Sequence, residues 1–206
     1  MNTMQGNGRV ELVFDFVSPN AYLVWWPLRD LIKRTGAQLD ITPVFLGGMH
    51  KLTGNAPPMI RDAEVKGKNE YAMLEMQRFI AKHNLNKYRL HPQFPFNSIT
   101  LQRMLVAAGQ DGRAVQFVET LLAPIWEEGV DITSPEALGA ALIGGGFDAG
   151  DLFARAQTDE VKQALVQSTD DAVARGAFGI PTMFVGEEMF FGKERLSQIE
   201  EELAKG

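Results

Sequence analysis

Ser18 and Pro19 stand between a strand-like segment and a helix-like segment, and their types suit anion chemistry. Serine is a favoured N-cap because its hydroxyl oxygen accepts a backbone N–H that the first helical turn leaves unpaired. Proline suits that first turn, where its missing N–H is not needed. Ser18 is therefore either a helix cap alone, or a cap that also donates to a ligand thiolate and so favours ionisation of the thiol.

Three further polar residues could bind a charged ligand. Asn55 lies in a segment rich in glycine and proline, where a turn asparagine is the simpler interpretation. Lys68 taken alone is a solvated charge, and Glu194, next to Lys193, is an acid of the kind that favours a helix N-terminus. The functional alternative is that Glu194 receives an ammonium group while Lys68 receives a carboxylate.

The lack of cysteine limits the chemistry of this chain of 206 residues. No disulfide, Cys-ligated zinc or redox cysteine can form, so any thiol must arrive on a ligand. The net charge of −6 argues against nucleic acid as the main partner. We expect no metal site, because His50, His83 and His91 lack ligand-like spacing. Without a long apolar run or a secretory signal, a cytoplasmic protein without membrane association is expected.

The elements that must position these residues begin with a strand at 10–16, a helix at 20–34 and a strand at 39–46. Strand, helix and strand form a βαβ unit with parallel strands. The glycines and prolines of 47–58 predict a loop. Apolar periodicity then predicts helices at 69–84, 98–108, 114–128, 135–144 and 160–175, with Ser134 and Thr158 as caps.

Strand signals return at 181–185 and, after a Gly186 turn, at 189–191, which predicts a hairpin before a last helix at 193–204. The expected fold is α/β: a discontinuous thioredoxin-like domain of residues 9–46 and 176–206, with an all-helical insertion at 47–175. Pro181 stands where thioredoxin-like folds have a cis proline. Such a bond would turn the N–H and C=O of Ile180 outward, free to pair with an extended ligand.

Four segments carry a resemblance to a known family. They are residues 14–22 (FDFVSPNAY), 53–58 (TGNAPP), 176–182 (GAFGIPT) and 191–196 (FGKERL). In this order and spacing they resemble the motifs of the 2-hydroxychromene-2-carboxylate isomerases and the related kappa-class glutathione transferases. The resemblance spans nearly the whole chain and implies a DsbA-like fold, glutathione as cofactor and a homodimer.

The resemblance also implies roles for individual residues. Ser18 would contact the glutathione sulfur, and Asn55 would lie near the ligand. Lys68, three residues before a tyrosine, would bind the glycine carboxylate, and Ile180, before Pro181, would pair with the cysteinyl backbone. The closing motif usually has Ser or Asn followed by Asp, which hold the γ-glutamyl end. Here Lys193 and Glu194 stand in those places, so a cation replaces a neutral group and the acid is one methylene longer.

The function implied is a glutathione-dependent isomerase that acts on aromatic keto acids of the 2-hydroxychromene-2-carboxylate type, with the thiolate held by Ser18. A transferase or peroxidase that consumes glutathione is the second hypothesis. The third is a thioredoxin-like module that binds peptide segments at Ile180 without catalysis.

Overall fold

The computed structural model describes residues 8–205. A four-stranded sheet with the order β2-β1-β3-β4 lies at its centre. The strands are β1 (Arg9–Phe14), β2 (Gln38–Pro43), β3 (Thr182–Val185) and β4 (Glu188–Phe191). β1 and β2 are parallel, while β1–β3 and β3–β4 are antiparallel. This arrangement confirms the expected βαβ unit and hairpin, and with them the DsbA-like α/β fold.

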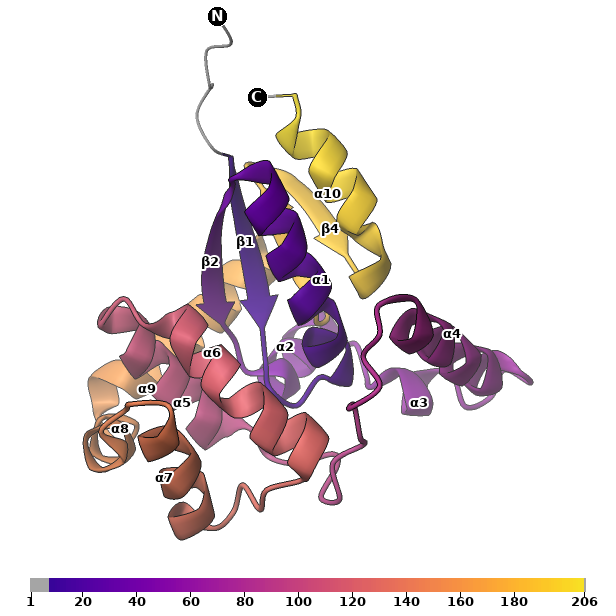
Figure 1. Cartoon of the computed structure of the whole chain (residues 1–206). Helices are drawn as coiled ribbons and strands as arrows, with labels where there is room; N and C mark the ends of the chain where they lie inside the picture. Colours follow the sequence, from indigo (N-terminus) through magenta and orange to yellow (C-terminus); the bar gives the residue numbers. More distant parts are fainter. Residues whose placement is uncertain (1–7, 206) are drawn as a thin grey trace, which may run out of the picture.

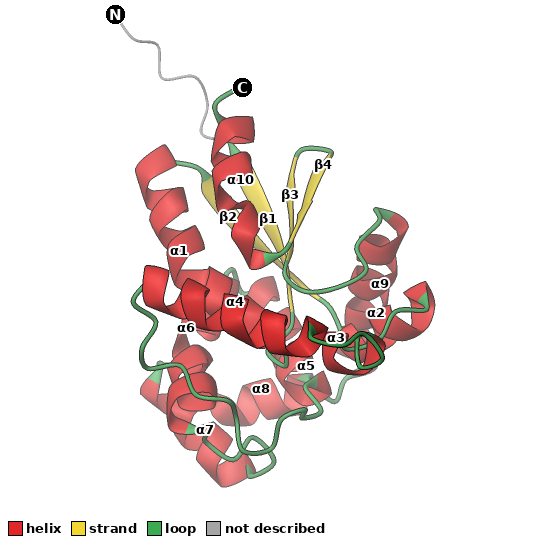
Figure 2. Ribbon diagram, turned by 90° about the vertical axis from the view of Figure 1, so that its right-hand side faces the viewer, coloured by secondary structure: helices red, strands yellow, loops and turns green. Residues whose placement is uncertain are grey.

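Two helices pack together on one side of the sheet (Figures 1 and 2). α1 (Pro19–Thr35) connects β1 to β2, and α10 (Leu196–Leu203) ends the described chain. α1 buries an apolar stripe that includes Tyr22 and Trp25, and it ends at Gly36, whose φ of 72° is a left-handed conformation that favours glycine. The stripe anchors α1, so the position of its first turn is determined by core packing.

The chain between β2 and β3 is helical and forms most of the lower part of the molecule in Figure 1. Its helices are α2 (Leu46–Thr53), α3 (Pro58–Arg61), α4 (Lys68–Lys82), α5 (Ile99–Gln110), α6 (Ala114–Ala123), a π-helical turn η1 (Pro124–Glu128), α7 (Pro135–Gly144), α8 (Ala149–Arg155) and α9 (Asp159–Ala174). Within residues 8–205, no helix is long and apolar enough to cross a membrane.

The loop predicted at 47–58 is wrong over most of its length, because α2 occupies its first half. Gly47 and Gly48 lie inside this helix, where a Cβ atom would come within 3.1 Å and 3.3 Å, respectively, of the Phe45 ring. These glycines permit close packing against an aromatic ring instead of forming a turn. Sequence composition could not distinguish the two uses.

Two other departures concern the end of one helix and a helix that the sequence analysis missed. The helix predicted at 114–128 is α-helical only to Ala123, and its last five residues form the π-helical turn η1. α8 was not predicted, although Asp148 caps it by accepting the Asp151 N–H at 3.0 Å. The caps predicted at Ser134 and Thr158 are confirmed, since both hydroxyl oxygens accept a backbone N–H in the first turn.

Candidate active site

The Ser18 corner is the buried junction between β1 and α1. Ser18 has the extended backbone of an N-cap, and its hydroxyl oxygen accepts the Ala21 N–H at 3.3 Å, as predicted. The same hydroxyl donates to the Ile180 carbonyl oxygen at 3.3 Å. Only 5% of Ser18 is exposed. The hydroxyl therefore links the positive end of α1 to the segment before β3.

The Ile180–Pro181 peptide bond is cis, as the resemblance to thioredoxin-like folds implies. The expectation for the Ile180 carbonyl is wrong, however, because this oxygen accepts the Ser18 hydroxyl instead of facing outward unpaired. Ile180 itself is 7% exposed. The cis proline and Ser18 thus lie side by side, since a short strand-to-helix corner and the start of β3 meet at the same end of the sheet.

Asn55 is brought to the same place by α2. The helix ends at Gly54, whose φ of 67° is left-handed, and this turn directs Asn55 back toward the start of β3. The Asn55 Nδ2 donates to the Phe178 carbonyl oxygen at 2.7 Å, two residues before Ile180. Its Oδ1 accepts the Ala56 N–H at 2.8 Å. Asn55 is therefore a turn residue whose side chain also holds the segment of residues 176–181, called the cis-proline loop.

Lys68 lies further out and already has a partner. Its ammonium group is 2.9 Å from an Asp62 carboxylate oxygen, and half of its side chain is exposed. Arg61 pairs with the same carboxylate, also at 2.9 Å. Hydrogen bonds from these two cations hold the pKa of Asp62 well below its usual range. A second contact of Arg61, 3.4 Å to the Asn55 Oδ1, connects the charged group to the site.

Lys193 and Glu194 form an ion pair with each other in the short 3₁₀ turn η2 (Lys193–Arg195), which leads into α10. The Lys193 side chain is 9% exposed and that of Glu194 is 45% exposed. The Lys193 ammonium group also lies 5.2 Å from the centre of the Phe79 ring on α4, a cation–π contact. The pair therefore presents one buried cation and one accessible carboxylate.

Aromatic contact joins η2 to the rest of the site. The centroid of the Phe191 ring, two residues before Lys193, lies 4.5 Å from the centroid of the Phe178 ring. Ser18 and Asn55 bind the carbonyls of Ile180 and Phe178, and the Gly192 N–H next to Lys193 donates to the Pro181 carbonyl at 3.0 Å. The predicted residues other than Lys68 therefore form one connected group around the cis proline. Lys68 lies at its periphery and is connected to it through Asp62 and Arg61.

Three side chains that the sequence analysis did not single out bind backbone groups around the Ser18 corner. They are those of Gln102, Trp126 and Asp15. Gln102 on α5 is fully buried, donates to the Phe14 and Val44 carbonyls at 2.7 and 2.8 Å, and accepts the Phe16 N–H at 3.3 Å. The Trp126 Nε1 donates to the Phe16 carbonyl at 3.1 Å. A polar residue among the apolar positions of a predicted helix was the available signal for Gln102.

The third missed residue is Asp15, which is fully buried. Its carboxylate accepts the Val17 N–H at 3.0 Å and the Leu46 N–H at 2.8 Å. Burial raises the pKa of Asp15 to about 6, although both backbone hydrogen bonds lower it. An acid between two phenylalanines of a strand pattern was the signal in the sequence. Among the described residues, no group of three or more His, Cys, Asp or Glu side chains could hold a metal ion.

Comparison with known proteins identifies a matching family and several relatives. The family model of the DSBA-like thioredoxin domain matches residues 9–204. A 2-hydroxychromene-2-carboxylate isomerase from Sphingobium xenophagum is 30% identical, over 93% of this chain and 95% of the relative. One from Pseudomonas putida is 28% identical, over 95% and 94%. Glutathione S-transferase kappa 1 from Rattus norvegicus is 26% identical, over 91% and 87%.

Solved structures give the same result. The structure of a 2-hydroxychromene-2-carboxylate isomerase has a TM-score of 0.81 and 25% identity, covering 96% of this chain and 95% of that one. A probable DsbA oxidoreductase from Streptomyces coelicolor has a TM-score of 0.68 at 16% identity, over 97% and 89%, which shows the shared fold alone. Two of these relatives are isomerases and therefore enzymes.

Proposed function

The chain belongs to the DSBA-like thioredoxin domain family, and we propose that it is a glutathione-dependent isomerase of aromatic keto acids of the 2-hydroxychromene-2-carboxylate type. The observation that carries this proposal is the Ser18 hydroxyl, buried at the N-terminus of α1 beside the cis proline. Two 2-hydroxychromene-2-carboxylate isomerases that align over nearly the whole chain support the reaction class.

The charges around the site match those of glutathione. The tripeptide has one thiol, two carboxylates and one ammonium group. The site offers a hydroxyl donor at a helix N-terminus in Ser18, partly exposed cations in Arg61 and Lys68, and the ion pair of Lys193 and Glu194. An ion pair is complementary to a zwitterion, so Glu194 would receive the γ-glutamyl ammonium group and Lys193 the neighbouring carboxylate.

The protein's task would be to keep the bound thiol ionised and oriented. Bound glutathione supplies a nucleophilic thiolate that adds to the substrate and is eliminated after the isomerisation. The Ser18 hydroxyl has a single proton, so it would turn from the Ile180 carbonyl to the sulfur when the ligand enters. The freed carbonyl of Ile180 would then be able to accept the cysteinyl N–H, while Pro181 holds it in place.

Asn55 and Lys68 would act at the two sides of this position. Asn55 holds the Phe178 carbonyl and so keeps the cis-proline loop in the conformation that receives the ligand. Lys68 would bind the glycine carboxylate, which would compete with Asp62 for the same ammonium group. Because half of the Lys68 side chain is exposed and Arg61 would stay paired with Asp62, this exchange of carboxylates costs little free energy.

Calorimetric titration with glutathione, followed by an assay with chromene carboxylates, tests the proposal. An isomerase converts substrate while the glutathione concentration stays constant. Consumption of glutathione would instead indicate conjugation or peroxide reduction, which the similarity to kappa-class transferases makes the second candidate. No binding at millimolar glutathione would overturn both and favour the peptide-binding module.

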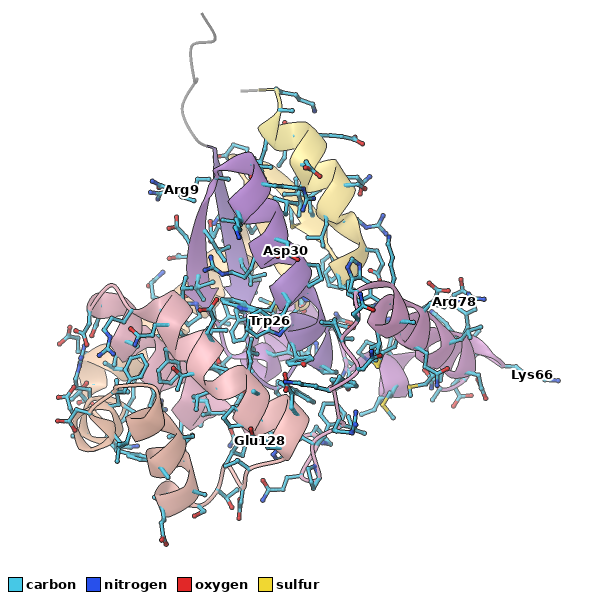
Figure 3. The ribbon with its side chains drawn as sticks, in the orientation of Figure 1. Arg9, Trp26, Asp30, Lys66, Arg78 and Glu128 are labelled. Atoms are coloured by element: carbon cyan, nitrogen blue, oxygen red, sulfur yellow. The ribbon has the colours of Figure 1, made fainter. Side chains whose placement is uncertain are left out.

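We also propose a homodimer formed through residues 58–82, which contain α3 and α4 and are called the α3–α4 arm. The arm projects from the body of the molecule, with Lys66 at its outer end (Figures 1 and 3). Its apolar side chains that are 53–70% exposed are Met59, Ile60, Val65, Tyr71 and Met73. Exposed apolar patches of this kind mark interfaces.

Analytical ultracentrifugation tests the dimer. Ile60→Glu should shift the protein to monomers, since a charge would then be buried in the interface. Ile143→Glu on α7 is the matched control, because Ile143 is 66% exposed and lies outside the arm. A wild-type monomer at all concentrations, or equal behaviour of both variants, would contradict the assignment.

A further inference from the structure

Asp15 is a buried acid that none of the proposed chemistry uses. Its two carboxylate oxygens bind different segments: one accepts the Val17 N–H at 3.0 Å, within the Ser18 corner, and the other accepts the Leu46 N–H at 2.8 Å, at the start of α2. The residue before α2, Phe45, has no side chain that caps the helix. A carboxylate from another segment therefore serves as the cap.

These contacts complete a closed path around the site. From Asp15 the path runs through α2 to Asn55, which binds the Phe178 carbonyl at 2.7 Å. Two residues later it reaches Ile180, whose carbonyl accepts the Ser18 hydroxyl at 3.3 Å. The Ser18 N–H donates to the Asp15 carbonyl oxygen at 3.1 Å and so returns to the start. Asp15 is the point where the two sides of the site are joined.

We propose that Asp15 is a positioning residue whose ionised carboxylate holds the Ser18 corner and the Asn55 loop in register for the ligand. The proposal rests on the proposed function of the site, because it concerns the placement of the same two ligand-binding residues. Asp15 itself does not touch the ligand. Its effect would be to keep Ser18 and Asn55 at the separation that a bound thiol peptide needs.

The charge on Asp15 matters because both oxygens accept N–H groups. An ionised carboxylate offers acceptors on each oxygen, whereas protonation turns one of them into a donor. One of the two hydrogen bonds from the Val17 and Leu46 N–H groups is then weakened, so the Ser18 corner and α2 are held together less firmly. Since burial raises the pKa of Asp15 to about 6, this change falls within the range of ordinary binding experiments.

Other ionisable groups lie on the elements packed around Asp15 and could in principle give the same pH dependence. They are His50 and Lys51 on α2, Arg103 on α5 and Asp170 on α9. None of them contributes to the pKa of Asp15, which is affected by its burial, by the Leu46 and Val17 N–H groups and by the Ser98 hydroxyl. His50 is the imidazole among them, and its burial and the nearby Arg61 lower its pKa.

The first test uses the ligand-free protein, so it does not depend on the proposed function. Amide proton shifts of Val17 and Leu46, followed by NMR over pH 4.5–8, should titrate together with a midpoint near pH 6. They should do the same in His50→Gln and should not titrate in Asp15→Asn. If the amide shifts do not titrate, or if their titration disappears in His50→Gln, the proposed link between Val17 and Leu46 through the Asp15 carboxylate is overturned.

The second test measures the affinity for S-methylglutathione, which has no thiol to ionise. For the wild type and His50→Gln, the affinity should fall about fivefold between pH 7.5 and 5, and Asp15→Asn should bind about tenfold more weakly at pH 7.5 with little pH dependence. Asp40→Asn is the control, because Asp40 forms an exposed ion pair with Arg9 on the far end of the sheet.

The outcomes separate the two proposals. If wild-type protein does not bind the peptide but its amides titrate as described, the glutathione proposal fails while the link through Asp15 stands as a structural device. If the wild type binds and Asp15→Asn binds equally well at every pH, the positioning role is overturned. A folded Asp15→Asn that loses stability with unchanged affinity would also overturn it, since that result indicates a structural role only.

Discussion

The Ser18 hydroxyl donates a hydrogen bond of 3.3 Å to the Ile180 carbonyl oxygen, which joins the first turn of α1 to the cis Ile180–Pro181 bond. The contact keeps both groups satisfied in the absence of ligand, since each is more than nine-tenths buried. The Ser18 hydroxyl, which is the donor proposed for the thiolate, thus already lies next to the Ile180 carbonyl that would bind the cysteinyl backbone. Ligand binding then exchanges one hydrogen bond for another.

Ser18→Ala should raise the pKa of bound glutathione and lower turnover at neutral pH by about tenfold to a hundredfold, the effect of losing a hydrogen bond to a charged group. The thiolate ultraviolet absorbance of the complex, titrated with pH, measures the change. Ser134→Ala is the matched control, because Ser134 also caps a helix before a proline and its oxygen accepts the Ala137 N–H at 3.1 Å.

Both serine variants should lose about 1 kcal/mol of stability with the N-cap, and Ser18→Ala should lose about 1–3 kcal/mol more, because the buried Ile180 carbonyl is left without its donor. Only Ser18→Ala should change the thiol. An unchanged thiolate absorbance in Ser18→Ala would refute the proposed role of this hydroxyl, and a loss of turnover in Ser134→Ala would show that cap stability alone explains the effect.

Glu194→Gln should weaken glutathione binding about tenfold, since it removes the carboxylate proposed for the ammonium group. It should also cost about 1 kcal/mol of stability, because the buried Lys193 ammonium loses its partner, a cost reduced by the partial exposure of Glu194. Adding Lys193→Met should restore stability but leave affinity low. Calorimetry and urea denaturation report the two effects, and full recovery of affinity in the double variant would contradict the assignment.

Asn55→Asp should destabilise the cis-proline loop by about 1 kcal/mol, because it places an acceptor opposite the Phe178 carbonyl where a donor now stands. Hydrogen exchange of residues 176–181 should accelerate, and glutathione affinity should fall. Asn69→Asp provides the comparison, since the Asn69 Nδ2 donates to the Met59 carbonyl at 3.0 Å in the same way. Equal exchange in the two variants would show that Asn55 does not brace the loop.

Ionisation of Asp15 should make the folded protein less stable as the pH rises from about 4 to 6. The carboxyl has a pKa of 3.8 when unperturbed and about 6 in the folded protein. Below about pH 4 both states are protonated; between the two values only the unfolded state ionises, so the free energy of unfolding falls by about 3 kcal/mol and stays lower above pH 6.

The measurement is urea denaturation of the wild type and Asp15→Asn at several pH values. The stability of the wild type relative to Asp15→Asn should decrease across that window, whatever constant offset the lost hydrogen bonds add. Parallel stability curves would mean that the Asp15 pKa is not raised.

Several features of the site follow from local sequence. The cap at Ser18 depends on a hydroxyl one residue before a proline at the start of an apolar helix, which is a property of adjacent residues. The βαβ unit and the hairpin follow from periodicity and turn residues in the same way. The assignment of α2 as a loop failed because two glycines serve tertiary packing there, against the ring of Phe45.

The sequence by itself determined the βαβ unit, the hairpin, the family and the absence of a cysteine thiol, since each depends on residue types and their spacing along the chain. Only the tertiary structure decided which charges are already paired: Lys68 with Asp62, and Lys193 with Glu194. It also placed Asp15 between Val17 and Leu46 and turned Ser18 to Ile180. Hydrogen bonds and ion pairs between segments distant in sequence depend on distances of a few ångströms, which are set by how helices pack on the sheet and which composition does not contain.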